Sequence, residues 1–136
     1  MSGSAPRLHS WGVVARILVI DDDLGWRELY GLELGDAHEI LQTADPIEGL
    51  DYVYAFAPDL LILDCQMPEM SGPELLATLR TRGIRVPVIL CTANPSQVRD
   101  VKCDGVVAKT TDLRRLRRTI DRVLAERDSR RHGRAA

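Results

Sequence analysis

The stretch DLLILDCQMPEMSG, residues 59–72, carries the strongest structural signal in this chain. Its four consecutive aliphatic residues, 60–63, show no alternation of polar and apolar side chains, which is typical of a strand buried on both faces of a parallel sheet. The run ends on a carboxylate, Asp64, and a loop with proline and glycine follows. Open α/β sheets bind ligands at the carboxyl ends of such strands, although a lone acid there more often only begins a turn.

The composition indicates a single globular domain. The chain has 136 residues, of which 45% are hydrophobic and 28% charged. No apolar run approaches the length of a membrane span, so we expect no membrane partner. The three cysteines are odd in number and irregularly spaced, which predicts reduced thiols in a cytoplasmic protein and neither a disulfide framework nor a zinc site.

The net charge of −2 conceals an uneven distribution along the chain. Residues 110–136 hold nine arginines and four acids, whereas residues 1–109 hold nine basic and sixteen acidic residues. A basic tail can attract nucleic acid. The arginines alternate with a regular apolar stripe, however, which favours the solvated face of a terminal helix and no nucleic-acid partner.

Strand and helix signals alternate five times along the chain. Expected strands span residues 16–20, 39–44, 60–64, 87–91 and 105–108, and expected helices span residues 24–34, 71–82 and 113–124, with others beginning at Pro46 and near Pro95. This alternation predicts an α/β fold, a doubly wound five-stranded parallel sheet with helices on both faces. We expect residues 1–15 to be a disordered extension, residues 16–127 the domain, and residues 128–136 a basic tail.

Several polar residues follow the expected strands and should meet at the carboxyl edge of the sheet. They are Asp21 and Asp22 after the first strand, Asp64 after the third, Thr92 after the fourth and Lys109 after the fifth. Carboxylates about 4 Å apart repel by roughly 4 kcal/mol per pair at an effective dielectric constant of 20, so a cation is expected. Oxygen ligands suit Mg²⁺ or Mn²⁺. Acids, metal, ammonium and hydroxyl together indicate phosphoryl transfer.

These residues stand in motifs that resemble one known family. The motifs are ILVIDDD (17–23), LD (63–64), MPEMSG (67–72), VILCTA (88–93) and VAK (107–109). In this order and spacing, the sequence over about residues 16–127 resembles the receiver domain of bacterial two-component response regulators. The resemblance implies a flavodoxin-like strand order of 2-1-3-4-5.

The resemblance also implies roles for individual residues at the acidic edge. It makes Asp64 the phosphoryl acceptor and Asp21 and Asp22 the acids that hold the metal. Asp22, Asp64 and the backbone carbonyl of Gln66 would be the direct ligands of Mg²⁺ or Mn²⁺.

Thr92 and Lys109 look like the two phosphoryl-stabilising residues that make the family a switch. The hydroxyl of Thr92 would move toward the phosphoryl group, and the ammonium of Lys109 would pair with its oxygens. The implied donor is a phosphohistidine on a sensor histidine kinase or a phosphotransfer protein. The implied output is an unidentified downstream protein, with a homodimer as a further option, and no enzymatic activity is expected beyond self-phosphorylation and slow autodephosphorylation.

The sequence departs from the family on the output side. Thr110 follows Lys109 where the family usually has proline after a cis bond, and Val106 replaces the usual aromatic switch residue. The interval from residue 92 to residue 109 leaves room for a shortened fourth helix of about two turns. Gln66 and Asn94 flank the site and could tune the lifetime of the phosphoryl group.

Two other functions compete with the phosphoacceptor switch. The atypical output side suits a phosphorylation-independent receiver-like docking module. Residues 21–25, DDDLG, superficially offer the D-x-D start of a haloacid-dehalogenase-type aspartyl phosphatase, although Gly25 departs from that pattern. We expect Asp23 to be a solvated loop acid, and we expect His9, His38 and His132 to lie on the surface.

Overall fold

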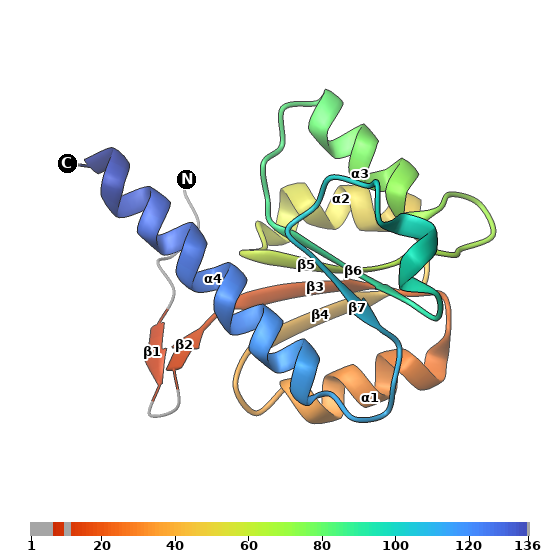
Figure 1. The fold of residues 1–136 in the computed structure, drawn as a ribbon, viewed down its shortest axis with the longest axis horizontal. Coiled ribbons are helices and arrows are strands. Elements are labelled where there is room, and N and C mark those ends of the chain that lie inside the picture. The colour runs from red at the N-terminus through yellow and green to blue at the C-terminus, as the bar shows by residue number, and fades with distance from the viewer. Residues whose placement is uncertain (1–6, 10–11, 136) are drawn as a thin grey trace.

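Five parallel strands form the central sheet, in a computed structural model that describes residues 7–9 and 12–135 (Figure 1). The strands are β3 (Arg16–Ile20), β4 (Glu39–Thr43), β5 (Leu60–Asp64), β6 (Val88–Thr92) and β7 (Gly105–Ala108). Their order across the sheet is β4-β3-β5-β6-β7, with every neighbouring pair parallel. The predicted doubly wound sheet and its 2-1-3-4-5 order are therefore confirmed.

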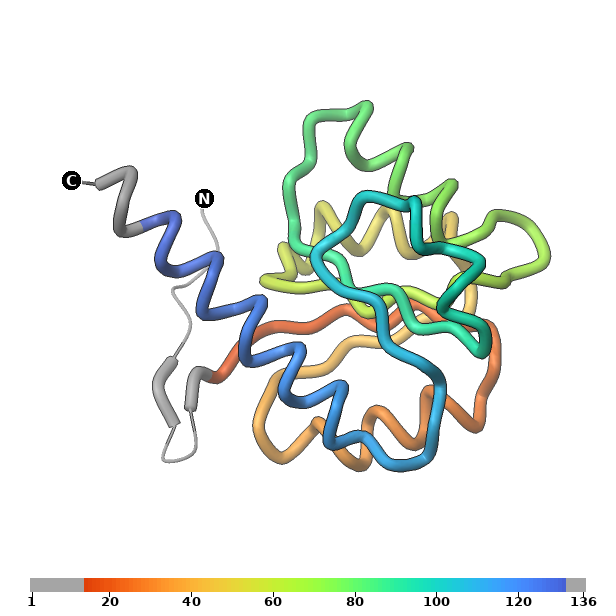
Figure 2. Tube along the Cα trace, viewed as in Figure 1, coloured from red at the N-terminus to blue at the C-terminus, as the bar shows by residue number. Residues whose placement is uncertain are grey.

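Helices cover both faces of this sheet. The α-helices of the described residues are α1 (Leu24–Leu34), α2 (Pro46–Phe56), α3 (Gly72–Thr81) and α4 (Arg114–Ala135). Helices α1 and α4 lie on one side of the sheet, and α2 and α3 lie on the other (Figure 2). Among the described residues, none of these helices is long and apolar enough to cross a membrane.

The core is two apolar layers that share the strands between them. Ile17 and Val19 of β3 pack with residues of α1 and α4, whereas Leu18 and Ile20 pack with residues of α2 and α3. This division follows from the alternation of side chains along a strand. All five residues of β5 are buried, as expected for a central strand, so Asp64 is held at the end of a rigid element.

Both ends of the chain carry more structure than the sequence predicts. Within the stretch expected to be disordered, β1 (Arg7–His9) pairs antiparallel with β2 (Gly12–Val14), and β2 contacts α4. Strands of three residues are too short to leave a periodic pattern, because backbone pairing rather than side-chain alternation holds them. Helix α4 continues through the expected tail to Ala135, since arginine is a good helix former.

The helix in the connection between β6 and β7 is shorter than the two turns expected. It is η1 (Pro95–Val98), a single turn of 3₁₀-helix that buries Val98. The peptide bond between Lys109 and Thr110 is trans, as are the other peptide bonds of the described residues. The fourth helix is thus shortened, as expected, but to a single 3₁₀ turn instead of about two turns. The loop after β7 leaves the sheet through a trans peptide bond.

Candidate functional site

A lysine bridges two buried carboxylates at the carboxyl edge of the sheet. The Lys109 ammonium nitrogen lies 2.9 Å from Asp21 Oδ2 and 3.1 Å from Asp64 Oδ1. The side chains of Lys109, Asp21 and Asp64 are 11%, 2% and 7% exposed. The backbone amide of Lys109 donates to the Thr92 carbonyl over 2.8 Å, which continues the β6–β7 pairing and fixes the lysine above the strand ends.

Asp21 is positioned by the turn that joins β3 to α1. Its Oδ1 accepts a hydrogen bond from the Asp23 amide over 2.9 Å, and its carbonyl accepts one from the Arg27 guanidinium over 2.8 Å. Asp23 is not merely a solvated loop acid, because its carboxylate caps α1 by accepting from the Trp26 amide over 3.1 Å. This capping role also removes support for the phosphatase alternative, whose D-x-D pattern would need Asp23 at the site.

The loop after β5 folds back beneath Asp64. The amide of Gly72 donates to the Cys65 carbonyl over 3.0 Å, and Met67 is buried. A Cβ atom on Gly72 would collide with the Asp64 carbonyl oxygen, so only glycine permits α3 to begin here. Gln66 is exposed, and its amide lies 3.4 Å from Asp64 Oδ1, a long hydrogen bond.

The electrostatics of the site raise the pKa of the Asp64 carboxyl above its ordinary value. Burial, together with the negative charge of Asp21, raises the pKa of Asp64 to about 6, although the Lys109 ammonium opposes this shift. Burial lowers the pKa of Lys109, but the hydrogen bonds and charges of Asp21 and Asp64 outweigh burial and raise it. Lys109 therefore stays charged, but its single positive charge does not balance the two carboxylates of Asp21 and Asp64.

The donor set at this edge fits a hard divalent cation. Carboxylate oxygens of Asp21, Asp22 and Asp64 lie within 4.8 Å of one another, and Asp22 is exposed. Asp21 Oδ2 is buried and, apart from its ion pair with Lys109, accepts no hydrogen bond of good geometry from the described residues. Three clustered carboxylates with one open to solvent suit Mg²⁺ or Mn²⁺, which keep some water ligands.

Thr92 and Asn94 lie on the neighbouring strand end. Thr92 is buried at the end of β6, and its hydroxyl oxygen accepts a hydrogen bond from the Asn94 amide over 3.1 Å. Asn94 is exposed, and its side-chain oxygen accepts from the Ser96 hydroxyl over 2.7 Å. This hydrogen bond uses a lone pair of the Thr92 oxygen, so the hydroxyl proton can still be donated to another acceptor.

The two atypical positions lie beside the site rather than in it. Val106 is half-buried against the apolar layer beneath α2 and α3. Thr110 is exposed, and its hydroxyl donates to the Asp112 carbonyl over 2.9 Å. Neither side chain offers the aromatic ring or the fixed turn that the family usually has at these positions.

Trp26 is a neighbour of the site that the sequence did not predict. The Lys109 ammonium lies 5.3 Å from the centre of the Trp26 ring, within the range of a cation–π contact. The signal was present, because α1 begins directly after the acidic triplet and carries Trp26 in its first turn.

The histidines lie away from this edge, as far as they are described. His38 is half-buried rather than on the surface, and its Nδ1 accepts from the Ala15 amide over 3.1 Å. Burial lowers the pKa of His38, although the charges of Asp121 and Asp59 oppose this shift. The side chains of His9 and His132 lie outside the described part of the chain.

Comparison with known proteins agrees with this geometry. The profile of the response regulator receiver domain matches residues 17–121. The transcriptional regulatory protein CiaR of Streptococcus pneumoniae is 37% identical over 81 residues, which cover 60% of this chain and 36% of CiaR. The response regulator MprA of Mycobacterium avium is 37% identical over 82 residues, with the same coverages. The matched region thus spans about a third of these relatives.

Solved structures show the same fold. The response regulator TrrA from Thermotoga maritima, solved in complex with Mg²⁺–BeF, superposes with a TM-score of 0.73 at 32% identity, covering 79% of this chain and 97% of TrrA. The chemotaxis protein CheY4 of Vibrio cholerae superposes with a TM-score of 0.73 at 27% identity, covering 81% and 98%. Together with the profile match, these similarities show that the chain belongs to the response regulator receiver domain family of two-component systems.

Proposed function

We propose that this receiver domain is a phosphoacceptor switch in which Asp64 receives a phosphoryl group. The donor is the phosphohistidine of a sensor histidine kinase or a phosphotransfer protein in the cytoplasm. The observation that carries the proposal is the Lys109 ammonium held between the buried carboxylates of Asp21 and Asp64. A buried nucleophile beside a fixed cation is suited to phosphoryl transfer, since charge develops on the transferring group.

The transfer exchanges one bond to phosphorus for another. With a pKa of about 6, Asp64 is mostly ionised at neutral pH, so its carboxylate oxygen is a competent nucleophile. That oxygen forms a bond to phosphorus as the phosphorus–nitrogen bond of the donor breaks, and the electron pair of that bond stays on the imidazole nitrogen. Lys109 then stabilises the charge of the phosphoryl oxygens.

The metal site of the proposal consists of residues already at this edge. Asp21, Asp22, Asp64 and the backbone carbonyl of Gln66 would hold Mg²⁺ or Mn²⁺. The bound ion would supply positive charge to the phosphoryl oxygens. The compact carboxylate cluster supports this assignment, as does the Mg²⁺–BeF complex of the related TrrA.

Thr92 and Lys109 are the residues proposed to turn phosphorylation into a change of conformation. Moving a population from mostly inactive to mostly active takes about 5.5 kcal/mol of differential interaction. A charge-assisted hydrogen bond is worth about 1.5–3 kcal/mol, so two or three such contacts suffice. Asn94 and Gln66 are exposed beside the site, where they would tune the access of water to the phosphoryl group.

The proposed role is signalling rather than turnover of a substrate. Beyond self-phosphorylation and slow autodephosphorylation, we propose no enzymatic activity. The phosphorylated form would engage a downstream protein or a second copy of the chain through the face around η1 and β7. That face differs from its usual form at Val106 and Thr110, so its partner would recognise a non-standard surface.

Intact-protein mass spectrometry after treatment with acetyl phosphate and Mg²⁺ tests the chemistry. We expect a mass gain of one phosphoryl group on the wild-type chain, loss of that gain on chelation, and no gain in Asp64→Asn. Asp51→Asn is the matched control, because Asp51 is an exposed acid of α2. Absence of the adduct in a folded wild-type chain, or its presence in Asp64→Asn, would overturn the proposal.

The docking module remains the second candidate, and the single turn of η1 favours it. In that function the fold presents a binding surface whatever the state of Asp64. A titration with Mg²⁺ and beryllofluoride, followed through the amide resonances of residues 93–112, separates the two candidates. Shifts throughout that segment support the switch, whereas binding at Asp64 with no shift there supports the docking module.

A further inference from the structure

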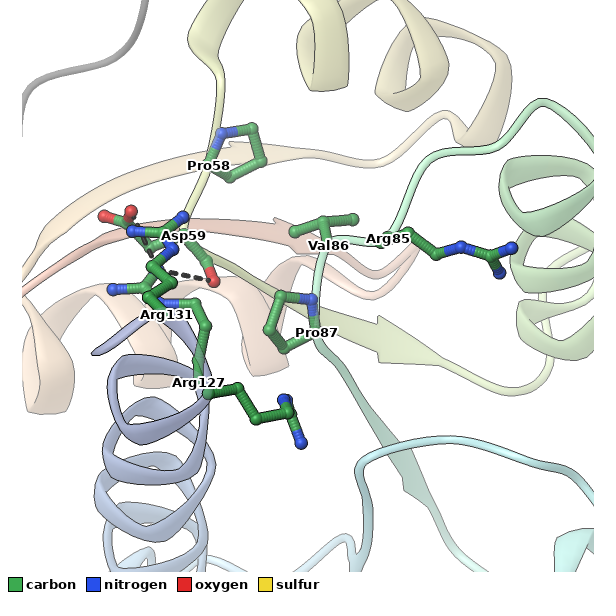
Figure 3. Close-up of a pocket in the computed structure, with 8 residues that line it drawn as sticks. Pro58, Asp59, Arg85, Val86, Pro87, Arg127 and Arg131 are labelled. Atoms are coloured by element: carbon green, nitrogen blue, oxygen red, sulfur yellow. Dashed lines mark hydrogen bonds and ion pairs between the residues drawn. The ribbon is translucent and has the colours of Figure 1, made fainter. Parts of the chain in front are cut away.

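The amino edge of the sheet contains a cavity of about 410 Å³ that the phosphoryl chemistry does not use. It lies between the loop before β5, the loop before β6 and the C-terminal half of α4 (Figure 3). Four arginines line it, namely Arg85, Arg127, Arg130 and Arg131. Asp59 is the one acid among its lining residues, and it lies at the opposite end of β5 from Asp64.

The single carboxylate of this cavity is already fully engaged. Asp59 Oδ1 lies 2.9 Å from Arg127 Nη1, and Asp59 Oδ2 accepts a hydrogen bond from the Arg16 amide over 2.8 Å. Arg127 and Asp59 are 7% and 11% exposed, and Arg127 also pairs with Asp128 over 3.0 Å. Arg127 is therefore built into the cavity wall, although the sequence pattern placed the arginines of this helix on a solvated face.

The other three arginines provide positive charge that the described residues do not neutralise. Arg85, Arg130 and Arg131 are exposed, and within residues 12–131 none of them forms an ion pair. Arginines near the end of α4 also interact favourably with the helix dipole, but Arg85 comes from a separate loop. A lining with arginines from two elements and a single acid therefore needs a further explanation.

We propose that this cavity binds a small molecule that carries phosphate groups. Guanidinium groups bind phosphate through paired hydrogen bonds and keep their charge at any physiological pH. The volume falls in the range of about 300–1,000 Å³ that small-molecule sites occupy, which is more than one phosphate needs. Pro58, Val86 and Pro87 add an apolar wall, which suits the ring or chain of an organic phosphate.

The proposed cavity is independent of the acidic edge. The strand between Asp59 and Asp64 rises about 3.3 Å per residue, so the two sites are separated by roughly 17 Å. Its charge is opposite to that of the acidic edge, so a cation that binds one edge is repelled by the other. The proposal can therefore fail while the phosphoacceptor function holds, and the reverse is equally true.

The test is a titration of the isotope-labelled chain with pyrophosphate and, separately, with ATP, followed by amide chemical shifts. Both titrations contain EDTA and no added metal, so that the acidic edge takes no part. We expect saturable shifts at residues 58–59, 85–87 and 127–131. The double variant Arg85→Gln/Arg131→Gln should lower the affinity by at least about tenfold. The control Arg82→Gln/Arg115→Gln removes the same charge from exposed arginines outside the cavity and should change the affinity by less than about twofold.

The two probes distinguish the sources of the phosphate. Tighter binding of ATP than of pyrophosphate indicates a nucleotide that uses the apolar wall, and equal binding indicates an inorganic polyphosphate; both outcomes support the site. Absence of saturable shifts at low ionic strength would overturn the proposal. Equal loss in the control variant would also overturn it, because the anion would then bind surface arginines in general. Unchanged urea midpoints of both double variants exclude a folding defect.

Discussion

The two edges of the sheet are electrostatic opposites built on the same strands. At the carboxyl edge, one cation, Lys109, is held between the buried acids Asp21 and Asp64. At the amino edge, one half-buried acid, Asp59, is held by Arg127, and further arginines line the same cavity. Each edge thus contains an excess of one charge around a single counter-ion.

The two buried ion pairs differ in what they do to stability. Asp59 accepts hydrogen bonds on both carboxylate oxygens. Asp64 accepts a long hydrogen bond from Gln66, and burial together with the charge of Asp21 raises its pKa. The Asp59–Arg127 pair at the amino edge is satisfied without a ligand, whereas the negative charge at the carboxyl edge is only partly offset by Lys109. A functional site can therefore be recognised by the electrostatic cost that the fold tolerates there.

Removal of Asp59, whose two carboxylate oxygens both accept hydrogen bonds, should have the largest effect on stability. Asp59→Ala leaves the Arg127 guanidinium buried without its main partner, so we expect a loss of about 3–5 kcal/mol in the free energy of unfolding. Urea denaturation measures this loss. The control Asp51→Ala removes an exposed acid from α2 and should change the free energy by no more than about 0.5 kcal/mol. Equal losses in the two variants would break the contrast between the edges.

Removal of Asp64, the acid with the raised pKa, should have the opposite effect on stability. In metal-free buffer at about pH 8, Asp64→Asn should raise the free energy of unfolding by up to about 3 kcal/mol, because ionisation of Asp64 is unfavourable in the folded state. The exposed Asp22 supplies the control, and Asp22→Asn should give a smaller gain. A stability loss in Asp64→Asn would show that the Lys109 pair outweighs burial and repulsion.

The gain in the free energy of unfolding of Asp64→Asn over the wild-type chain should become smaller as the pH falls. The pKa of Asp64 is about 6 in the folded chain against an ordinary value of 3.8, so between these values folding takes up a proton. The stability of the wild-type chain relative to Asp64→Asn should therefore rise as the pH falls through 6, and the difference should vanish near pH 4. Urea denaturation across this range measures it, and a difference independent of pH would contradict the assigned shift.

Addition of Mg²⁺ should stabilise the carboxyl edge alone. At ten times its dissociation constant, a ligand that binds only the folded state raises the free energy of unfolding by about 1.4 kcal/mol. We expect this rise in the wild-type chain and in Arg85→Gln, and its loss in Asp22→Ala. Thermal denaturation with and without the ion measures it. A rise that persists in Asp22→Ala would place the ion elsewhere.

The contact between Trp26 and Lys109 should have the smallest effect. Trp26→Leu removes the ring near the ammonium and should cost about 0.5–1 kcal/mol beyond the loss of packing. Trp26→Phe keeps an aromatic face at this position and should retain part of that amount. The same two substitutions are then made in a Lys109→Met background. If each costs as much free energy there as in the wild-type chain, the ring contributes packing only and not a cation–π contact.

The carboxyl edge was accessible to sequence reasoning because its signals are local. Each strand that matters is a short aliphatic run, and each polar residue of the site directly follows such a run. Asp64, Thr92 and Lys109 could therefore be assigned to one edge from the topology of parallel strands alone. The cap formed by Asp23 was missed, because an acid after a strand has the same local pattern whether it caps a helix or faces solvent.

The amino edge was not accessible in this way. Arg127 and Asp59 are 68 residues apart, and in the sequence Arg127 is one arginine among many on an amphipathic helix. Its burial depends on where α4 crosses the start of β5, which no local pattern records. The hairpin of β1 and β2 was missed for a related reason, since pairing across two three-residue strands leaves no periodic signal.

The sequence by itself determined the alternation of strands and helices, the parallel sheet and the residues at its carboxyl edge, because periodicity and strand ends are properties of neighbouring residues. Only the tertiary structure decided which charges are buried and how they pair. The bridge from Lys109 to two acids and the pairing of Arg127 with Asp59 both depend on distances between separate elements. Electrostatic energy depends on those distances and on burial, and neither is a property of the sequence pattern.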